Sequence, residues 1–132
     1  MKDRAEVLVL DDEEIVCERL KAHLENNDFE VETFTESKRA IDRLREKSFD
    51  VVVTDLKMEG PSGLDVLHFV RNQMQGTQVI MITGYASIEA AREADYTGVY
   101  EFILKPFQLE EMGKLVKKAA KKAMKLKRRA EK

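Results

Sequence analysis

The chain has 132 residues, a net charge of −2 and 43% hydrophobic residues, which suits one compact core and leaves little room for a second domain. Its single cysteine, Cys17, excludes an intramolecular disulfide. No apolar run approaches the ~18 residues of a membrane span or the ~7–15 of a secretory signal. We therefore expect a cytoplasmic protein without membrane segments.

Five short apolar runs follow one another along the chain, at 7–10, 29–34, 51–53, 79–82 and 100–103. The first, third and fourth are continuous and rich in β-branched residues, which is typical of strands buried on both faces. The second alternates apolar and polar residues and the fifth is mixed, so both are predicted to be edge strands.

Segments of helical periodicity separate these runs. Apolar stripes extend from Ile15 to Leu24, Ala40 to Leu44, Leu64 to Val70 and Ile88 to Ala94, the last preceded by Ser87 as its N-cap. Regular alternation of strands and helices predicts an α/β three-layer sandwich with right-handed crossovers. Two edge strands and three buried ones fit a parallel five-stranded sheet of order 2-1-3-4-5.

The C-terminal part predicts an extended fifth helix. An apolar position recurs at steps of three and four residues, at Leu109, Met112, Val116, Ala119, Ala123, Leu126 and Ala130. The first half is expected to pack on the sheet. Beyond about Ala120 we expect no surface of the body under the helix, so the seam there needs a partner, such as a second copy. We therefore divide the chain into a domain at 1–120 and a basic helical extension at 121–132.

Charge is distributed unevenly. From Lys114 to Lys132 there are ten Lys or Arg residues and one acidic residue, Glu131, whereas the rest of the chain is strongly acidic. Such a tail is most often a solvated helix face, and less often an arm that binds nucleic acid or a membrane surface.

Polar residues follow four of the predicted strands, where the carboxyl ends of parallel strands meet. They are Asp11 and Asp12, then Asp55, Thr83 and Lys105. Crowded carboxylates favour a hard divalent cation such as Mg²⁺, and a carboxylate can carry a phosphoryl group whose oxygens an ammonium contacts. Each residue alone has an ordinary structural explanation, such as an acidic first helical turn. Their joint placement favours a phosphoryl-transfer site.

Four motifs at these positions resemble the receiver domain of bacterial two-component response regulators, over about residues 5–120. They are VLDDE at 9–13, VVTDLKM at 52–58 followed by Gly63, ITG at 82–84 and FILKPF at 102–107. The resemblance implies a flavodoxin-like (βα)5 fold. It also implies a phosphorelay module, not a classic enzyme, that assists its own phosphorylation and dephosphorylation.

The resemblance assigns roles to individual residues. Asp55 is the expected phosphoacceptor, and Asp12 and Asp55 are the expected direct ligands of Mg²⁺ or another divalent cation, with Asp11 acting through water and the backbone carbonyl of Lys57 completing the set. Lys105 is expected to contact the phosphoryl group and to precede a cis bond to Pro106.

Two further residues are implied as a switch pair, in which the Thr83 hydroxyl moves to the phosphoryl group and the Phe102 ring turns inward. Some positions depart from the family pattern. Glu59 stands where proline is common, and Asp95 where the fourth helix more often has an apolar residue. Lys57 and Tyr85 occupy positions that tune the loss of the phosphoryl group.

The implied partners are a sensor histidine kinase or phosphotransfer protein, and a second copy bound through the fifth helix or the face of the fourth helix, fifth strand and fifth helix. The implied output is a partner or an attached domain, for example in transcription regulation; direct DNA binding is not expected. Two alternatives stay open: an unphosphorylated scaffold that dimerises through the tail, and nucleic-acid binding by the tail. No nucleotide-binding loop, nucleophile elbow or Asp-x-Asp phosphatase motif is found.

Overall fold

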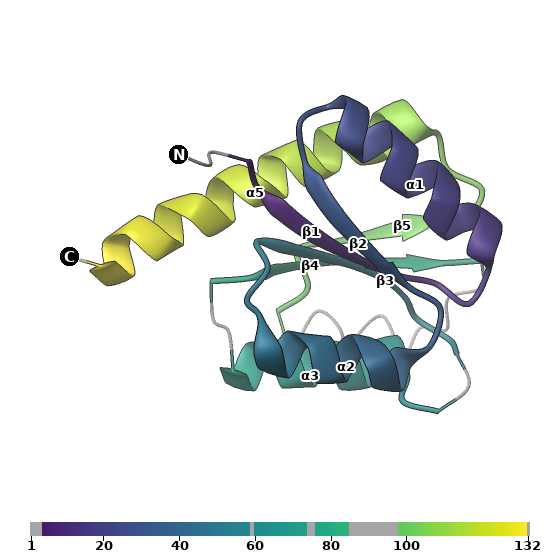
Figure 1. Cartoon of the computed structure of the whole chain (residues 1–132), viewed down its shortest axis with the longest axis horizontal. Helices are drawn as coiled ribbons and strands as arrows, with labels where there is room; N and C mark the ends of the chain where they lie inside the picture. Colours follow the sequence, from purple (N-terminus) through teal and green to yellow (C-terminus); the bar gives the residue numbers. More distant parts are fainter. Residues whose placement is uncertain (1–3, 59, 74–75, 85–97, 132) are drawn as a thin grey trace.

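The computed structural model describes residues 4–58, 60–73, 76–84 and 98–131 (Figure 1). The helix expected from Ile88 to Ala94, together with Glu59, Tyr85 and Asp95, lies outside the described residues. No helix in the described part of the chain is long and apolar enough to cross a membrane.

Five strands form one parallel sheet, and its order β2-β1-β3-β4-β5 confirms the prediction. The strands are β1 (Glu6–Leu10), β2 (Glu30–Phe34), β3 (Val51–Asp55), β4 (Gln78–Thr83) and β5 (Glu101–Leu104). The two strands without apolar continuity, β2 and β5, lie at the edges and are only partly buried. The continuous runs form the buried strands β1, β3 and β4, because helices cover both faces of the sheet there.

The four described helices cover the two faces in pairs, as Figure 1 shows. They are α1 (Glu14–Asn26), α2 (Ser37–Glu46), α3 (Gly63–Gln73) and α5 (Leu109–Glu131). Along β1, Val7 and Val9 join the core cluster with α1 and α5, while Leu8 and Leu10 join the cluster with α2 and α3. Successive strand residues thus point to opposite faces, and the three-layer sandwich is confirmed.

Helix α3 begins where the chain passes very close to β3. A Cβ atom on Gly63 would lie 2.3 Å from the Asp55 backbone oxygen and 2.9 Å from Leu56 Cα. Only glycine fits this approach, which sets the path of the loop that follows Asp55.

The expectation that α5 has nothing to pack against beyond Ala120 is wrong. Ala123 is 3% exposed, and Leu126 Cβ lies 3.7 Å from the position that a Cβ on Gly76 would take. The helix continues over the amino-terminal edge of the sheet, where Phe49 is also buried. Leu126 and Phe49 line a hollow of about 460 Å³ there, so the apolar stripe has an intramolecular surface past residue 120.

Candidate functional site

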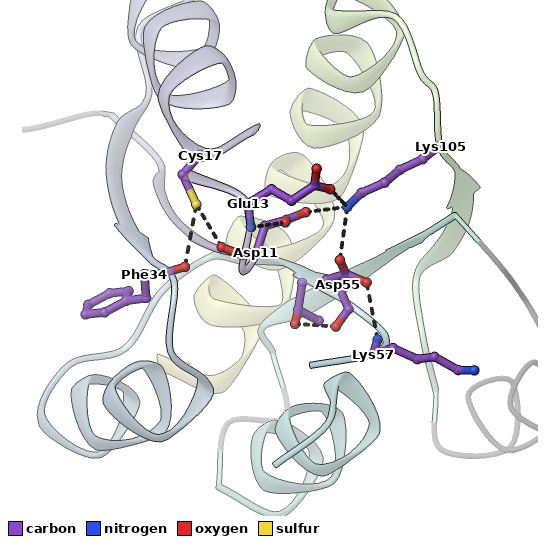
Figure 2. A network of polar contacts seen from close by, with 8 residues as sticks. Asp11, Glu13, Cys17, Phe34, Asp55, Lys57 and Lys105 are labelled. Atoms are coloured by element: carbon purple, nitrogen blue, oxygen red, sulfur yellow. Dashed lines mark hydrogen bonds and ion pairs between the residues drawn. The ribbon is translucent and has the colours of Figure 1, made fainter. Parts of the chain in front are cut away.

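The carboxyl-terminal edge of the sheet brings together three of the predicted polar residues, Asp11, Asp55 and Lys105 (Figure 2). Asp11 directly follows β1 and Lys105 directly follows β5, while Asp55 and Thr83 are the last residues of β3 and β4. Asp55 is paired in register with Ile82, so the sheet itself fixes its backbone. A residue in the strand ladder is held more firmly than one in a loop, which suits a reacting group.

Lys105 lies at the centre of this cluster. Its Nζ is 2.9 Å from Asp11 Oδ2, 3.0 Å from Asp55 Oδ2 and 3.0 Å from Glu13 Oε1 (Figure 2). An ammonium has three hydrogens, and here three carboxylates surround it. The lysine therefore joins the ends of β1, β3 and β5 through charge.

Backbone N–H groups orient the two buried carboxylates from the other side. The Glu13 N–H donates to Asp11 Oδ1 at 2.8 Å, and the Lys57 N–H donates to Asp55 Oδ1 at 3.2 Å. Each carboxylate thus has one oxygen held by the backbone and the other next to Lys105. The side chains cannot turn away without losing one of these contacts.

Burial makes this charge cluster costly. Asp11 is fully buried and Asp55 is 7% exposed. Loss of hydration raises the pKa of Asp11 above its usual value, although the Glu13 N–H and Lys105 partly offset this. Burial acts to lower the pKa of Lys105, but the contacts of its ammonium with the carboxylates of Asp11, Glu13 and Asp55 outweigh this and raise the pKa, which keeps the ammonium charged.

Three carboxylates fit a divalent cation. Oxygens of Asp11, Asp12 and Asp55 lie within 4.8 Å of one another, and Asp12 is exposed at the mouth of the cluster. The buried Asp11 Oδ2 has ion-pair contact with Lys105 but no partner in hydrogen-bond geometry. A hard cation with oxygen ligands would satisfy this atom and relieve the repulsion, so the residues present fit Mg²⁺.

The other predicted residues surround this cluster. Thr83 is 2% exposed at the end of β4. Phe102, on β5, pairs in register with Met81 and packs half-buried against the core cluster on the α2 and α3 face. The Lys57 side chain points away from the cluster in Figure 2, and only its backbone N–H contacts Asp55. The Lys105–Pro106 peptide bond is cis, as expected.

Sequence reasoning missed two neighbours of the cluster. Glu13 belongs to the first motif, but its position in the sequence indicates no role beyond an acidic helix start, although its carboxylate contacts Lys105. The buried Cys17 donates weakly to the Asp11 and Phe34 backbone oxygens, with Sγ–O distances of 3.4 and 3.5 Å. Burial raises the pKa of this thiol to about 11, and the nearby charge of Asp11 adds to the effect. The lysine contact spans 92 residues of sequence, so no local pattern indicates it.

Comparison with known proteins places the chain in a family. The family model of the response regulator receiver domain matches residues 7–117. A putative NtrX-like response regulator of Rickettsia typhi is 34% identical over 125 residues, which cover 93% of this chain and 26% of that protein. The transcriptional regulatory protein ZraR of Escherichia coli is 29% identical over 89% of this chain and 26% of its own length. The chain thus spans about a quarter of the length of these curated relatives.

Solved structures agree with this. A receiver domain from Clostridium thermocellum is 31% identical with a TM-score of 0.85, over 92% of this chain and 98% of that one. The receiver domain of NtrC4, solved as a beryllofluoride-activated dimer, is 33% identical with a TM-score of 0.83, over 93% and 99%. Receivers are signalling modules of two-component systems that are phosphorylated on an aspartate and generally bind Mg²⁺ in an acidic pocket. This chain belongs to the response regulator receiver domain family.

Proposed function

We propose that this receiver accepts its phosphoryl group on Asp55. The observation that supports this most strongly is the contact of Asp55 Oδ2 with Lys105 Nζ at 3.0 Å, beside the oxygens of Asp11 and Asp12. Asp11 is fully buried, so a phosphodonor cannot reach it, and Asp12 lies exposed in the loop after β1. Asp55 is the acid that is held by the backbone, paired with an ammonium and still in part exposed.

In the proposed reaction a carboxylate oxygen of Asp55 attacks the phosphorus atom of the donor. A new O–P bond forms as the bond to the leaving group breaks, which for acetyl phosphate releases acetate. The Lys105 ammonium neutralises charge on the phosphoryl oxygens, and the Lys57 N–H holds the carboxylate in place. Attack by water on phosphorus later restores the carboxylate and releases phosphate, so the domain assists both steps.

The proposed metal ligands are Asp12 and Asp55 directly, Asp11 through water and the backbone carbonyl of Lys57. Bound Mg²⁺ supplies positive charge to the phosphoryl oxygens in this arrangement. The grouping of three carboxylates and the hydrogen-bond deficit of Asp11 Oδ2 support this assignment.

The acyl phosphate at the end of β3 would carry a charge of about −2 in place of the carboxylate, which can draw in neighbouring donors. Thr83, on the neighbouring strand β4, is the proposed hydroxyl donor, and Phe102 the proposed ring that follows it, because β4 and β5 are paired from Ile80 to Thr83. The altered surface would then control a partner or an attached output domain, for example in transcription regulation as in ZraR.

The proposed phosphodonor partner is a sensor histidine kinase or phosphotransfer protein. The proposed homodimer uses α5 or the face that includes β5 and α5, and the activated NtrC4 receiver dimer supports it as a structural neighbour. The extension at 121–132 would serve as the linker to an output domain. Sedimentation with and without phosphodonor tests the dimer: a larger species only after phosphorylation supports it, and an unchanged monomer counts against it.

The central experiment compares Asp55→Asn with Asp42→Asn, which changes an exposed carboxylate on α2 that pairs with Arg45. Both proteins receive acetyl phosphate with and without Mg²⁺, and intact-mass spectrometry and hydroxylamine sensitivity report the acyl phosphate. We expect Mg²⁺-dependent phosphorylation of wild type and of Asp42→Asn, and none of Asp55→Asn. A hydroxylamine-sensitive phosphate on Asp55→Asn would overturn the assignment.

A further inference from the structure

Glu13 occupies the N-cap position of α1 but does not cap the helix. Its backbone is extended, and its side chain makes no hydrogen bond to the first turn. N-cap side chains ordinarily accept from the N–H groups of that turn, and glutamate is not a preferred residue there. Instead the carboxylate reaches across to Lys105, with Oε1 3.0 Å from Nζ (Figure 2). The structure of α1 therefore does not account for the orientation of this side chain.

The acids around Lys105 form two groups. Asp11 and Asp55 belong, with Asp12, to the carboxylates whose oxygens approach within 4.8 Å of one another, and among the described residues Glu13 is not part of that group. Glu13 is also more exposed, with 58% of its side chain accessible, against 0% for Asp11 and 9% for Asp55. Lys105 thus lies between the group suited to a metal and one acid outside it.

This arrangement sets two cations in competition. The Oδ2 atoms of Asp11 and Asp55, which contact Lys105, belong to carboxylates that a divalent cation would also use. Each carboxylate has its other oxygen engaged by a backbone N–H. A bound cation therefore weakens the hold of Asp11 and Asp55 on the ammonium, and Glu13 is the acid that keeps its contact.

We propose that Glu13 is a positioning residue for Lys105, holding the ammonium at the edge of the site when Asp11 and Asp55 bind a divalent cation. The lysine then stays within reach of an incoming phosphoryl group without blocking the metal. This role rests on the proposed function for its purpose, but the coupling between Glu13, Lys105 and the metal can be measured without phosphorylation.

The experiment must distinguish the ion pair between Glu13 and Lys105 from the general effect of a negative charge near the metal site. A carboxylate near a metal favours cation binding through its field, and an acid in the first turn also suits the helix dipole. Glu13→Gln removes both charge and ion pair, whereas Glu13→Asp keeps the charge on an arm one methylene shorter, which cannot span the same distance to Lys105. Glu14→Gln removes an acid from the next position and is the matched control.

The experiment is calorimetric titration of Mg²⁺ into the unphosphorylated full chain. Without the Glu13 contact, Lys105 rests on Asp11 and Asp55 and must be displaced, so we expect Glu13→Gln and Glu13→Asp to bind Mg²⁺ about two- to fivefold more weakly, the range for a partly exposed ion pair. Glu14→Gln should bind as wild type does. Wild-type affinity of Glu13→Asp, or of both Glu13 variants, would overturn the proposal.

A double-mutant cycle with Lys105→Met provides the second readout. If Glu13 acts through the lysine, Glu13→Gln should leave Mg²⁺ affinity unchanged in the Lys105→Met background. The same two- to fivefold loss in both backgrounds would mean that charge alone acts, and the proposal would fail. Circular dichroism checks the fold of each variant. Because no step needs an acyl phosphate, failure of Asp55 as acceptor leaves this result interpretable.

Discussion

The two ends of the sheet satisfy their polar groups in different ways. At the amino-terminal edge, the Thr77 hydroxyl donates to the Phe49 oxygen at 2.6 Å, and the Glu6 N–H donates to Asp50 Oδ2 at 2.8 Å. At the carboxyl-terminal edge, three carboxylates surround Lys105, and the buried Asp11 Oδ2 lacks a hydrogen bond. The carboxyl-terminal edge therefore concentrates carboxylates that a cation would relieve, whereas these contacts at the amino-terminal edge join the starts of neighbouring strands.

Helix α5 reinforces the difference because it crosses the sheet towards the amino-terminal edge (Figure 1). Its buried residues Met112, Val116 and Ala119 pack beside α1, and Ala123 continues the buried stripe over the amino-terminal edge. The C-terminal half of α5 thus covers the edge of the sheet that lacks the charged cluster. The reactive edge has no comparable cover among the described residues, and its mouth is formed by exposed acids such as Asp12.

The largest contrast should come from one glycine at each edge. Gly63→Ala places a Cβ 2.3 Å from the Asp55 oxygen, and backbone cannot yield, so we expect a loss of about 3 kcal/mol or more in the free energy of unfolding. A Cβ on Gly76 would lie 3.7 Å from Leu126 Cβ and 4.0 Å from the Ala123 backbone oxygen, which are ordinary contacts, so Gly76→Ala should change the free energy of unfolding by less than about 1 kcal/mol. Urea denaturation measures both. Equal losses would show that the loop after β3 can relax and that the close approach is not required.

Shortening α5 tests the stable edge next. A chain that ends after Ala120 lacks the buried Ala123 and the half-buried Leu126, and should lose about 2 kcal/mol relative to one that ends after Lys127. The chain ending after Lys127 is the control, because it keeps both contacts and drops only the terminal residues. If the two unfold at the same urea concentration as monomers, the stripe beyond Ala120 does not stabilise the body and serves only as a seam between copies.

The strands, their order and the centre of the site could be predicted from the sequence. The strands and their order follow from apolar runs such as 79–82, because a strand buried on both faces must be apolar throughout. The gathering of Asp11, Asp55 and Lys105 follows from the strand ends alone, since parallel strands share one carboxyl edge. The fold and the centre of the site were therefore predictable.

What the sequence did not predict depends on what covers a surface. Leu126 repeats at the same spacing whether the stripe packs on its own sheet or on a second copy, so periodicity identifies the face but not its neighbour. Glu13 likewise reads as an acid that suits a helix start. Its contact with Lys105 depends on the extended N-cap backbone and on a residue from the far edge strand, which only the assembled fold brings near.

A smaller effect on stability is expected from the charge of the buried Asp11 carboxylate at the carboxyl-terminal edge. Burial raises the pKa of Asp11, so the folded protein favours the protonated carboxyl and the ionised form opposes folding. The stabilisation by the protonated carboxyl is present at low pH and is lost as pH rises through the pKa of the folded state. At pH 7 without metal, Asp11→Asn should therefore unfold at a higher temperature than wild type.

Thermal unfolding with a chelator, and then with Mg²⁺, measures this. Wild type should gain stability with Mg²⁺ by mass action, and Asp11→Asn should gain much less. Asp42→Asn, at an exposed ion pair, serves as the control and should respond to Mg²⁺ like wild type. A metal-free Asp11→Asn protein that unfolds below wild type would indicate that the attraction of Lys105 outweighs the cost of burying the carboxylate.

The last prediction concerns Cys17, which lies under the reactive edge with its Sγ 3.4 Å from the Asp11 backbone oxygen. Its thiol pKa is raised to about 11 from an ordinary 9.0, chiefly by burial, so the thiol favours folding below pH 9 and this contribution is lost as pH rises from 9 to 11. The stability of wild type relative to Cys17→Ala should fall across that range and stay constant below it.

At pH 8, the thiolate fraction of Cys17 in the folded protein is about a hundredfold lower than in the unfolded chain. Iodoacetamide should therefore modify native Cys17 at least that much more slowly than it modifies the chain in urea. Equal rates would mean that α1 opens readily and that the reactive edge is less tightly packed than the ion pairs around Lys105 indicate.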